Sequence, residues 1–213
     1  MMTEEERGAW LALRAGKLTA SRMNDAMAFT KKLESMAARN DYLRELLAER
    51  ICDHSARHFV SEAMRHGIAY EDEAKIAYEA ATGNLLTDPR TAADLGFFSH
   101  PRIENFGASP DSLLGKHGLL EVKCPTTPKF VAWKLAGVVP EEHQKQMIAQ
   151  LACTGRRYCV FCAYEPRIRE VDRRLFILRF EPTREQITEV ETAAIAFLET
   201  LDEMFSQFVG APA

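Results

Sequence analysis

Two acidic residues and a lysine stand close together in the segment SPDSLLGKHGLLEVKCP, which covers residues 109–125. Asp111 follows a proline, and Glu121 and Lys123 lie two residues apart in a run that alternates in polarity like a β-strand. Alternate residues of a strand point to the same face of a sheet, so Glu121 and Lys123 share one face. A hairpin that turns between Gly115 and Gly118 would bring Asp111 back beside Glu121.

These three residue types suit a metal-dependent phosphodiesterase. Two carboxylates at ligand distance can hold a hard cation such as Mg²⁺, and Mn²⁺ is expected to substitute for it. A lysine beside them can orient a water molecule and stabilise negative charge on a phosphate. An ordinary charged surface hairpin is the alternative, but the pattern D-x9-E-x-K followed by Cys-Pro is far more restrictive. The segment therefore indicates a nuclease.

A third acidic residue is expected, because two carboxylates leave a metal ion under-coordinated. Glu71, in the segment GIAYEDE at residues 67–73, is the candidate because it lies on a predicted helix ahead of the sheet. A solvated helix face is the alternative interpretation, and spacing alone hardly distinguishes the two.

The composition of the 213-residue chain, with 46% hydrophobic and 27% charged residues, is ordinary for a globular protein. A net charge of −4 argues against a general nucleic-acid coat but leaves room for local basic clusters. No apolar run approaches the roughly 20 residues that span a bilayer, and the acidic start MMTEEERGAW lacks an apolar signal region. A cytoplasmic protein without membrane association is expected. Cys159 and Cys162 fall in a strand-like run, so their side chains face opposite ways and suit buried thiols better than metal ligands.

The hydrophobic periodicity changes from helical to strand-like and back along the chain. Helices are predicted at residues 4–14, 19–28, 41–54, 61–82, 130–135, 140–154 and 183–208. Strands are predicted at residues 85–87, 95–99, 105–109, 113–114, 119–123, 158–163 and 174–180. This order predicts an α/β protein with a mixed central β-sheet flanked by helices. We expect one nuclease domain over 1–213, with a helical part at 1–84, a sheet-containing catalytic core at 85–182 and a C-terminal helix at 183–209.

Two further groups of polar residues have both a functional and a simpler interpretation. His143, Gln146 and Gln150 form a polar stripe on the helix after the hairpin, for which solvent exposure is the simpler explanation. Arg14 and Ser21 could form a phosphate pocket near a helix N-terminus, whereas a cap and a surface arginine are the simpler alternative.

Together these residues resemble the phage lambda exonuclease (YqaJ-type) family of recombination nucleases, within the PD-(D/E)xK superfamily. The resemblance extends from about Trp10 to Arg167. Its matched segments are W-x3-R-x-G-x2-T-A-S at 10–21, G-x3-E at 67–71, S-P-D at 109–111, E-x-K-C-P at 121–125, Gln146, T-G at 154–155 and Y-x-P-R at 164–167. Several blocks in one order are more specific than the hairpin alone, and they imply a restriction endonuclease-like core.

The resemblance implies roles for particular residues. Catalytic roles are implied for Glu71, Asp111, Glu121, Lys123 and Gln146. The metal would be held by Asp111, Glu121 and the backbone carbonyl of Val122, with Glu71 in support. Lys123 would orient the attacking water.

The same resemblance implies a set of DNA contacts. Arg14, Ser21 and Ser109 match positions that hold the 5′-phosphate of the digested strand. Met64 falls where the family has an apolar wedge, and Lys31 where a basic loop residue follows the duplex. His143 stands where the lambda enzyme has a tyrosine, and it is included among the DNA-binding residues.

The implied activity is 5′→3′ degradation of one strand of linear double-stranded DNA from a 5′-phosphorylated end. The 3′ overhang that remains would serve phage-type recombination by strand annealing. The resemblance implies a homotrimeric ring, an annealing protein as partner, and a phage or prophage gene expressed in the cytoplasm of a bacterial host. A PD-(D/E)xK endonuclease and a catalytically inactive DNA-binding or docking module are the alternatives. The intact Asp111, Glu121 and Lys123 set argues against the inactive module.

Overall fold

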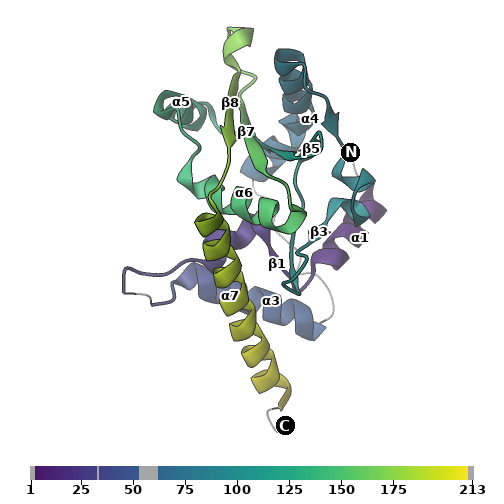
Figure 1. Ribbon diagram of the computed structural model, residues 1–213, viewed down its shortest axis with the longest axis vertical. Coiled ribbons are helices and arrows are strands. Elements are labelled where there is room, and N and C mark those ends of the chain that lie inside the picture. The colour runs from purple at the N-terminus through teal and green to yellow at the C-terminus, as the bar shows by residue number, and fades with distance from the viewer. Residues whose placement is uncertain (1–2, 33, 53–61, 211–213) are drawn as a thin grey trace.

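The computed structural model describes residues 3–32, 34–52 and 62–210, except the side chains of residues 62–64 (Figure 1). The helices are α1 (Glu4–Arg14), α2 (Met23–Ala26), α3 (Ala37–Cys52), α4 (Glu62–Thr82), α5 (Thr127–Ala136), α6 (Glu141–Thr154) and α7 (Arg184–Gly210). The strands are β1 (Leu18–Thr19), β2 (Leu86–Thr87), β3 (Phe98–Ser99), β4 (Phe106–Ala108), β5 (Ser112–Leu114), β6 (Gly118–Lys123), β7 (Tyr158–Tyr164) and β8 (Leu175–Phe180).

These strands form two sheets rather than the one central sheet that the sequence predicted. The larger sheet has the order β2-β5-β6-β7-β8, and its strands are antiparallel except for the parallel pair β6 and β7. The smaller sheet has the order β1-β4-β3. Pro110 lies between β4 and β5 and has no backbone N–H to donate to a ladder, which suits the break between the sheets. The mixed α/β class with flanking helices is confirmed.

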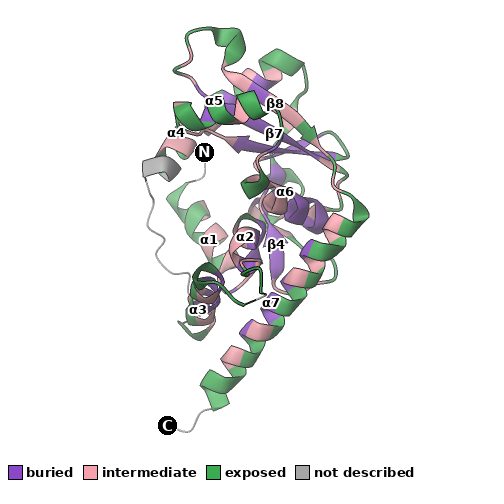
Figure 2. Ribbon diagram, turned by 90° about the vertical axis from the view of Figure 1, so that its left-hand side faces the viewer, coloured by how far each residue is buried: buried purple, intermediate pink, exposed green. Residues whose placement is uncertain are grey.

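Both faces of the larger sheet are buried under helices. One face of β6 and β7, which includes Leu119 and Cys159, packs against α5 and α6. The opposite face, which includes Leu120 and Cys162, packs against α4. The two cysteines are free thiols on opposite faces, as the strand alternation predicted. Figure 2 shows β7 buried over most of its length.

Helix α6 connects this core to a second one. Its Met147 and Leu151 belong to the cluster under the larger sheet. Its Ile148 and Cys153 belong to a cluster that also contains buried residues of β4, α2, α3 and α7. Because α6 is packed on two sides, its rotation about its own axis is fixed. Helix α7 crosses the second cluster and extends away from the body toward the C-terminus (Figure 1).

Three of the predicted elements differ from those observed. The helix expected at 19–28 is a 3-10 turn (Ala20–Arg22) followed by the short α2, and Thr19 makes no side-chain capping bond. The Thr19 hydroxyl lies 3.4 Å from the Tyr42 hydroxyl, which is a tertiary contact with α3. The strand expected at 95–99 is shortened, because Leu95 has a left-handed backbone with φ of 48°. Helix α3 begins at Ala37 rather than at residue 41.

The other predicted elements agree with the structure to within a few residues. The hydrogen bonds between Thr183 and Gln186 cap the start of α7. The predicted end of one helix at residue 54 and the start of another at residue 61 lie outside the described residues. Within the described part of the chain, no helix combines the length and apolar character needed to cross a membrane.

Candidate functional site

The hairpin formed by β5 and β6 brings Asp111 and Glu121 together. Ser112 pairs with Leu120 in the antiparallel register, so the preceding Asp111 falls opposite Glu121. The Asp111 carboxylate accepts a hydrogen bond of 2.6 Å from the Val122 backbone N–H. This bond fixes one carboxylate oxygen against β6, and the predicted juxtaposition of the two acidic residues is observed.

Glu121 is held by three side chains. It is 1% exposed. One of its oxygens lies 2.6 Å from Lys123 Nζ and accepts a 2.6 Å hydrogen bond from Gln146 Nε2. The other oxygen accepts a 2.6 Å hydrogen bond from Gln150 Nε2. Lone pairs remain on a carboxylate that accepts three such contacts, so Glu121 can still ligate a cation.

The charges of this cluster depend on one another. Burial raises the pKa of Asp111 well above its usual value, and the nearby charges of Glu121 and Glu71 raise it further. Burial alone would lower the pKa of Lys123, but Glu121 and Asp111 outweigh that effect and raise it. Lys123 is therefore an ammonium ion beside two carboxylates that repel each other.

Glu71 approaches the cluster from α4 and has a partner of its own. Its Oε1 lies 2.6 Å from the ammonium of Lys75, one helical turn further along. The charge of Glu71 acts on both Asp111 and Lys123, so it belongs to the electrostatic environment of the hairpin. The charge of Asp111 also acts on Lys75, which makes Lys75 a second lysine near the site.

The donor set suits a divalent cation. A positive charge would relieve the repulsion between the Asp111 and Glu121 carboxylates, and hard cations prefer such oxygen ligands. Among residues 3–32, 34–52 and 62–210, no three His, Cys, Asp or Glu side chains form a metal-binding group by themselves. A cation here would therefore depend on Asp111, Glu121, a backbone carbonyl such as that of Val122, and water, which Mg²⁺ commonly retains.

Arg14 and Ser109 meet beside this site. The Ser109 hydroxyl accepts hydrogen bonds from Arg14 Nη1 at 3.4 Å and from Trp10 Nε1 at 3.2 Å. The Arg14 guanidinium also lies 3.9 Å from the Trp10 ring centroid. Burial lowers the pKa of Arg14 to about 10, although Tyr42 and Glu49 oppose the shift. The guanidinium remains charged at neutral pH while it is partly removed from water, which favours an anionic ligand.

The smaller sheet positions these residues. Strand β1 follows α1 and runs parallel to β4, with Leu18 beside Phe106. Ser109 follows β4 directly and precedes Asp111 by two residues, so the Arg14 group and the carboxylate hairpin are adjacent. Ser21 is exposed, and its hydroxyl lies 3.3 Å from that of Thr19, which in turn contacts Tyr42.

His143 lies among aromatic side chains. Its ring is stacked on Phe161 at 5.6 Å and meets Trp133 nearly at a right angle at 5.1 Å. Burial lowers the pKa of His143 to about 4, and the charge of Lys123 adds to this shift. His143 is therefore neutral at physiological pH and could contact DNA only as an uncharged group. Its DNA-binding role remains a prediction.

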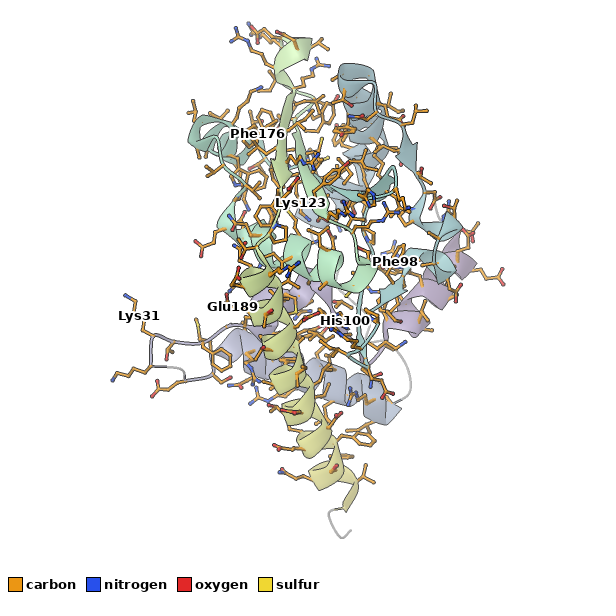
Figure 3. The ribbon with its side chains drawn as sticks, viewed as in Figure 1. Lys31, Phe98, His100, Lys123, Phe176 and Glu189 are labelled. Carbon is orange, nitrogen blue, oxygen red and sulfur yellow. The ribbon has the colours of Figure 1, made fainter. Side chains whose placement is uncertain are left out.

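The remaining predicted DNA contacts lie away from the hairpin or outside the description. Lys31 is exposed on the loop between α2 and α3, which projects from the body on the side away from Lys123 (Figure 3). Met64 lies within α4, but its side chain is outside the described residues. The roles expected of both residues remain predictions.

Sequence reasoning left out three residues that contact the site. Gln150 was noted on the α6 stripe but not assigned to the site, although it lies four residues after Gln146 and donates to the same carboxylate. Lys75 could have been found at the i+4 position from Glu71. Trp10 was part of the matched motif, but only the tertiary structure brings its indole to Ser109.

The fold is that of known exonucleases. Residues 9–157 match the model of the YqaJ-like viral recombinase domain. The alkaline exonuclease LHK-Exo from Laribacter hongkongensis is 37% identical, with a TM-score of 0.83, and the match covers 97% of this chain and 96% of that chain. The structure of LHK-Exo in complex with dAMP gives a TM-score of 0.84 at the same identity and coverage.

A phage-related exonuclease from Haemophilus somnus 129PT is similar in fold alone, with 13% identity, a TM-score of 0.66, and coverage of 90% of this chain and 96% of that chain. No curated protein matches the chain significantly.

The fold and the carboxylate–lysine hairpin together define a PD-(D/E)xK-like nuclease of the lambda exonuclease type. The chain belongs to the YqaJ-like viral recombinase family, whose model matches well over half of its length. The family indicated by the sequence motifs is thereby confirmed.

Proposed function

We propose that the protein is a Mg²⁺-dependent 5′→3′ exonuclease that degrades one strand of linear double-stranded DNA. The observation that carries the proposal is the location of the Arg14–Ser109 group two residues from Asp111 in the buried carboxylate–lysine hairpin. A terminal 5′-phosphate bound by Arg14 and Ser109 would place a neighbouring phosphodiester at the carboxylates. An enzyme that holds the chain end in this way would act from ends and spare closed circles.

Each residue of the cluster has a chemical role in this proposal. Bound Mg²⁺ would supply positive charge against the scissile phosphate and favour ionisation of a water molecule. Asp111 and Glu121 would hold the ion, while Gln146 and Gln150 keep the Glu121 carboxylate in position. Lys123 would hold the attacking water and offset the charge that develops on the phosphate.

The wider context of the proposal comes from the family. We propose that Mn²⁺ can replace Mg²⁺, that the protein acts as a homotrimeric ring, and that its partner is a single-strand annealing protein. The 3′ overhang would be the substrate of that partner in phage or prophage recombination within the bacterial cytoplasm.

The proposed function is tested by Mg²⁺-dependent digestion of a linear duplex with one 5′-phosphorylated end, beside a covalently closed circle. We expect stepwise loss of the phosphorylated strand while the circle stays intact. Cleavage of the circle would instead indicate an endonuclease. Tight binding of both DNAs without cleavage would indicate the inactive docking module.

Replacing Arg14 by alanine should remove the preference for 5′-phosphorylated ends. The guanidinium is partly desolvated, and charge-assisted hydrogen bonds of this kind contribute about 1.5–3 kcal/mol, or roughly 10- to 100-fold in binding. The ratio of initial rates on 5′-phosphate and 5′-hydroxyl ends should therefore approach one in R14A. Arg7, which is exposed on the same helix, provides the matched control R7A. An unchanged ratio in R14A would contradict the proposed role of Arg14 in binding the 5′-phosphate.

A further inference from the structure

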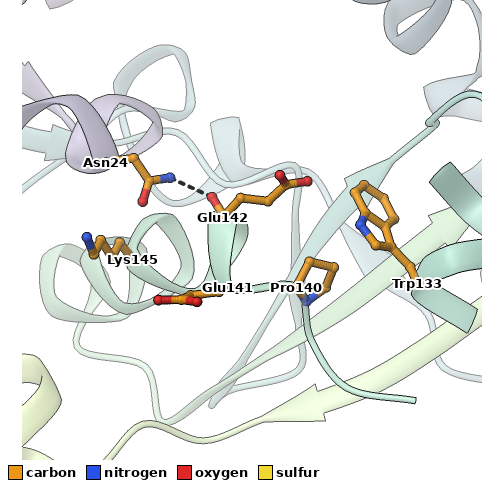
Figure 4. A pocket seen from close by; sticks show the side chains of 6 residues that line it. All are labelled: Asn24, Trp133, Pro140, Glu141, Glu142 and Lys145. Carbon is orange, nitrogen blue, oxygen red and sulfur yellow. Dashed lines mark hydrogen bonds between the residues drawn. The ribbon is translucent and has the colours of Figure 1, made fainter. Parts of the chain in front are cut away.

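A pocket of about 530 Å³ lies between α2, α5 and the N-terminal turn of α6. Its lining residues are Asn24, Trp133, Pro140, Glu141, Glu142 and Lys145 (Figure 4). Figure 4 shows the Glu142 side chain reaching toward the indole of Trp133, with Asn24 and Lys145 at the other end. The volume is within the range of pockets that bind small ligands, and neither the sequence motifs nor the proposed site uses it.

The pocket shares α6 with the catalytic cluster. Glu142 and Lys145 lie on either side of His143, and Gln146, which donates to Glu121, follows directly. With a rise of about 1.5 Å per residue, Glu142 and Gln146 are separated by about 6 Å along the helix axis. His143 also contacts Trp133 and lies within the electrostatic influence of Lys123. His143 and Trp133 therefore connect the pocket with the neighbourhood of Lys123.

Trp133 is fixed in place, and the Lys129 ammonium lies over its ring at 5.0 Å from the centroid. His143 and Phe161 meet its ring at 87° and 72°, so neither ring stacks parallel to the indole. Helix α5, which carries Trp133, is tied at its start by the bond from Thr127 to the buried Glu165, and at its end by Lys134. The residue remains partly exposed at the pocket. A rigid, partly exposed aromatic side chain of this kind is the usual platform for stacking a nucleobase.

The charges around the pocket favour a base over a phosphate. Glu141 and Glu142 offset Lys145 and Lys129, and Lys129 pairs with Glu142 at 2.8 Å while its ammonium lies 5.0 Å from the Trp133 ring centroid. A nearly neutral rim gives little attraction for a phosphate group by itself. A base within a duplex already has neighbours on both faces, so only an unpaired base can stack on the indole.

We propose that this pocket binds an unpaired nucleobase of a DNA strand held at the catalytic cluster, through stacking on Trp133. The proposal rests on the proposed nuclease function, because that function brings a DNA strand to α6. It assigns to the pocket the recognition of single-stranded DNA beside the cutting site.

Fluorescence can test this assignment directly, because the chain has two tryptophans, Trp10 and Trp133. Quenching that is present in the wild type and absent in W133F reports on Trp133, and this comparison leaves the contact of Trp10 with Ser109 intact. We expect a short single-stranded oligodeoxynucleotide in EDTA to quench the emission of Trp133 saturably, whereas a covalently closed dumbbell duplex should not. The variant N24F should fill the pocket and weaken the quenching titration about tenfold, since stacking of a base contributes about 1–3 kcal/mol. The variant N24A, which also loses the bond from Asn24 to the Glu142 backbone carbonyl but does not fill the pocket, is the matched control.

Three results would overturn the assignment: no quenching by the oligonucleotide, equal quenching by the dumbbell, or equal titrations for N24F and N24A. Circular dichroism of each variant identifies loss of folding. Digestion of linear duplex by the unmodified protein separates this proposal from the proposed function. Digestion without quenching would contradict the proposed base pocket alone. Quenching without digestion would support the pocket as a DNA-binding site and contradict the proposed nuclease function.

Discussion

Replacing Asp111 by asparagine is expected to abolish hydrolysis and, at the same time, to stabilise the metal-free protein. Activity should fall by more than about 10³-fold, because the loss of a proposed metal ligand exceeds the 10- to 100-fold cost typical of residues behind the ligands. Stability should rise because burial and the neighbouring carboxylates disfavour the charged form of Asp111. Initial rates with Mg²⁺ and urea unfolding in EDTA measure the two effects.

The pH dependence of this stabilisation has a defined sign. The pKa of Asp111 is raised in the folded state above its usual value of 3.8, so the folded protein binds this proton more tightly than the unfolded chain does. Wild-type stability is therefore lost as the pH rises above about 3.8, until the folded pKa is passed. The advantage of D111N should be small below pH 3.8 and should grow toward neutral pH. An advantage that shrinks with rising pH would contradict the burial of a carboxylate at this position.

A lysine variant provides the matched comparison. K123M should lose activity as severely as D111N, but it should be less stable than the wild type, because the buried Glu121 loses its ion-pair partner. Equal activity losses with opposite stability changes would show that neither loss results from unfolding. Turnover close to that of the wild type in either variant would contradict the assignment of the hairpin as the catalytic site.

The second large effect is expected from Gln150, which lies behind the proposed metal ligand. Replacing it by leucine keeps the approximate volume but leaves one oxygen of the buried Glu121 without its donor. We expect a loss of about 1–3 kcal/mol of stability from the unpaired group and a 10- to 100-fold fall in kcat. The Mg²⁺ concentration for half-maximal rate should rise, because the carboxylate is no longer held in place. Urea unfolding and a Mg²⁺ titration of the initial rate measure these changes.

Gln144 provides the control for Gln150. It lies on the same helix, but its side chain donates to the Val139 backbone carbonyl rather than to the catalytic cluster. Q144L should leave the Mg²⁺ dependence unchanged. If Q150L and Q144L have the same Mg²⁺ dependence, Gln150 has a structural role without effect on the metal ligand.

The sequence by itself determined the hairpin and the side chains that it brings together. The period-two pattern of residues 119–123 and the glycine-punctuated turn fix the alternation of side chains, so the juxtaposition of Asp111, Glu121 and Lys123 follows from local geometry. The same local rule placed Cys159 and Cys162 on opposite faces of β7. The ordered motifs indicated the family, since several short blocks in one order are specific without knowledge of the fold.

The tertiary structure decided which distant residues join that hairpin. The stripe of Gln146 and Gln150 could have been a solvated face, and only the packing of α6 between two cores turns it toward Glu121. Arg14 and Trp10 reach Ser109 through the parallel pairing of β1 with β4, two segments almost 90 residues apart. The helix expected at 19–28 is instead a 3-10 turn and a short helix, and the Thr19 hydroxyl contacts Tyr42 of α3. The periodicity of a sequence indicates which side of a helix or strand is polar. Which residues that polar side contacts depends on how the element packs against other elements, and a single sequence does not show that packing.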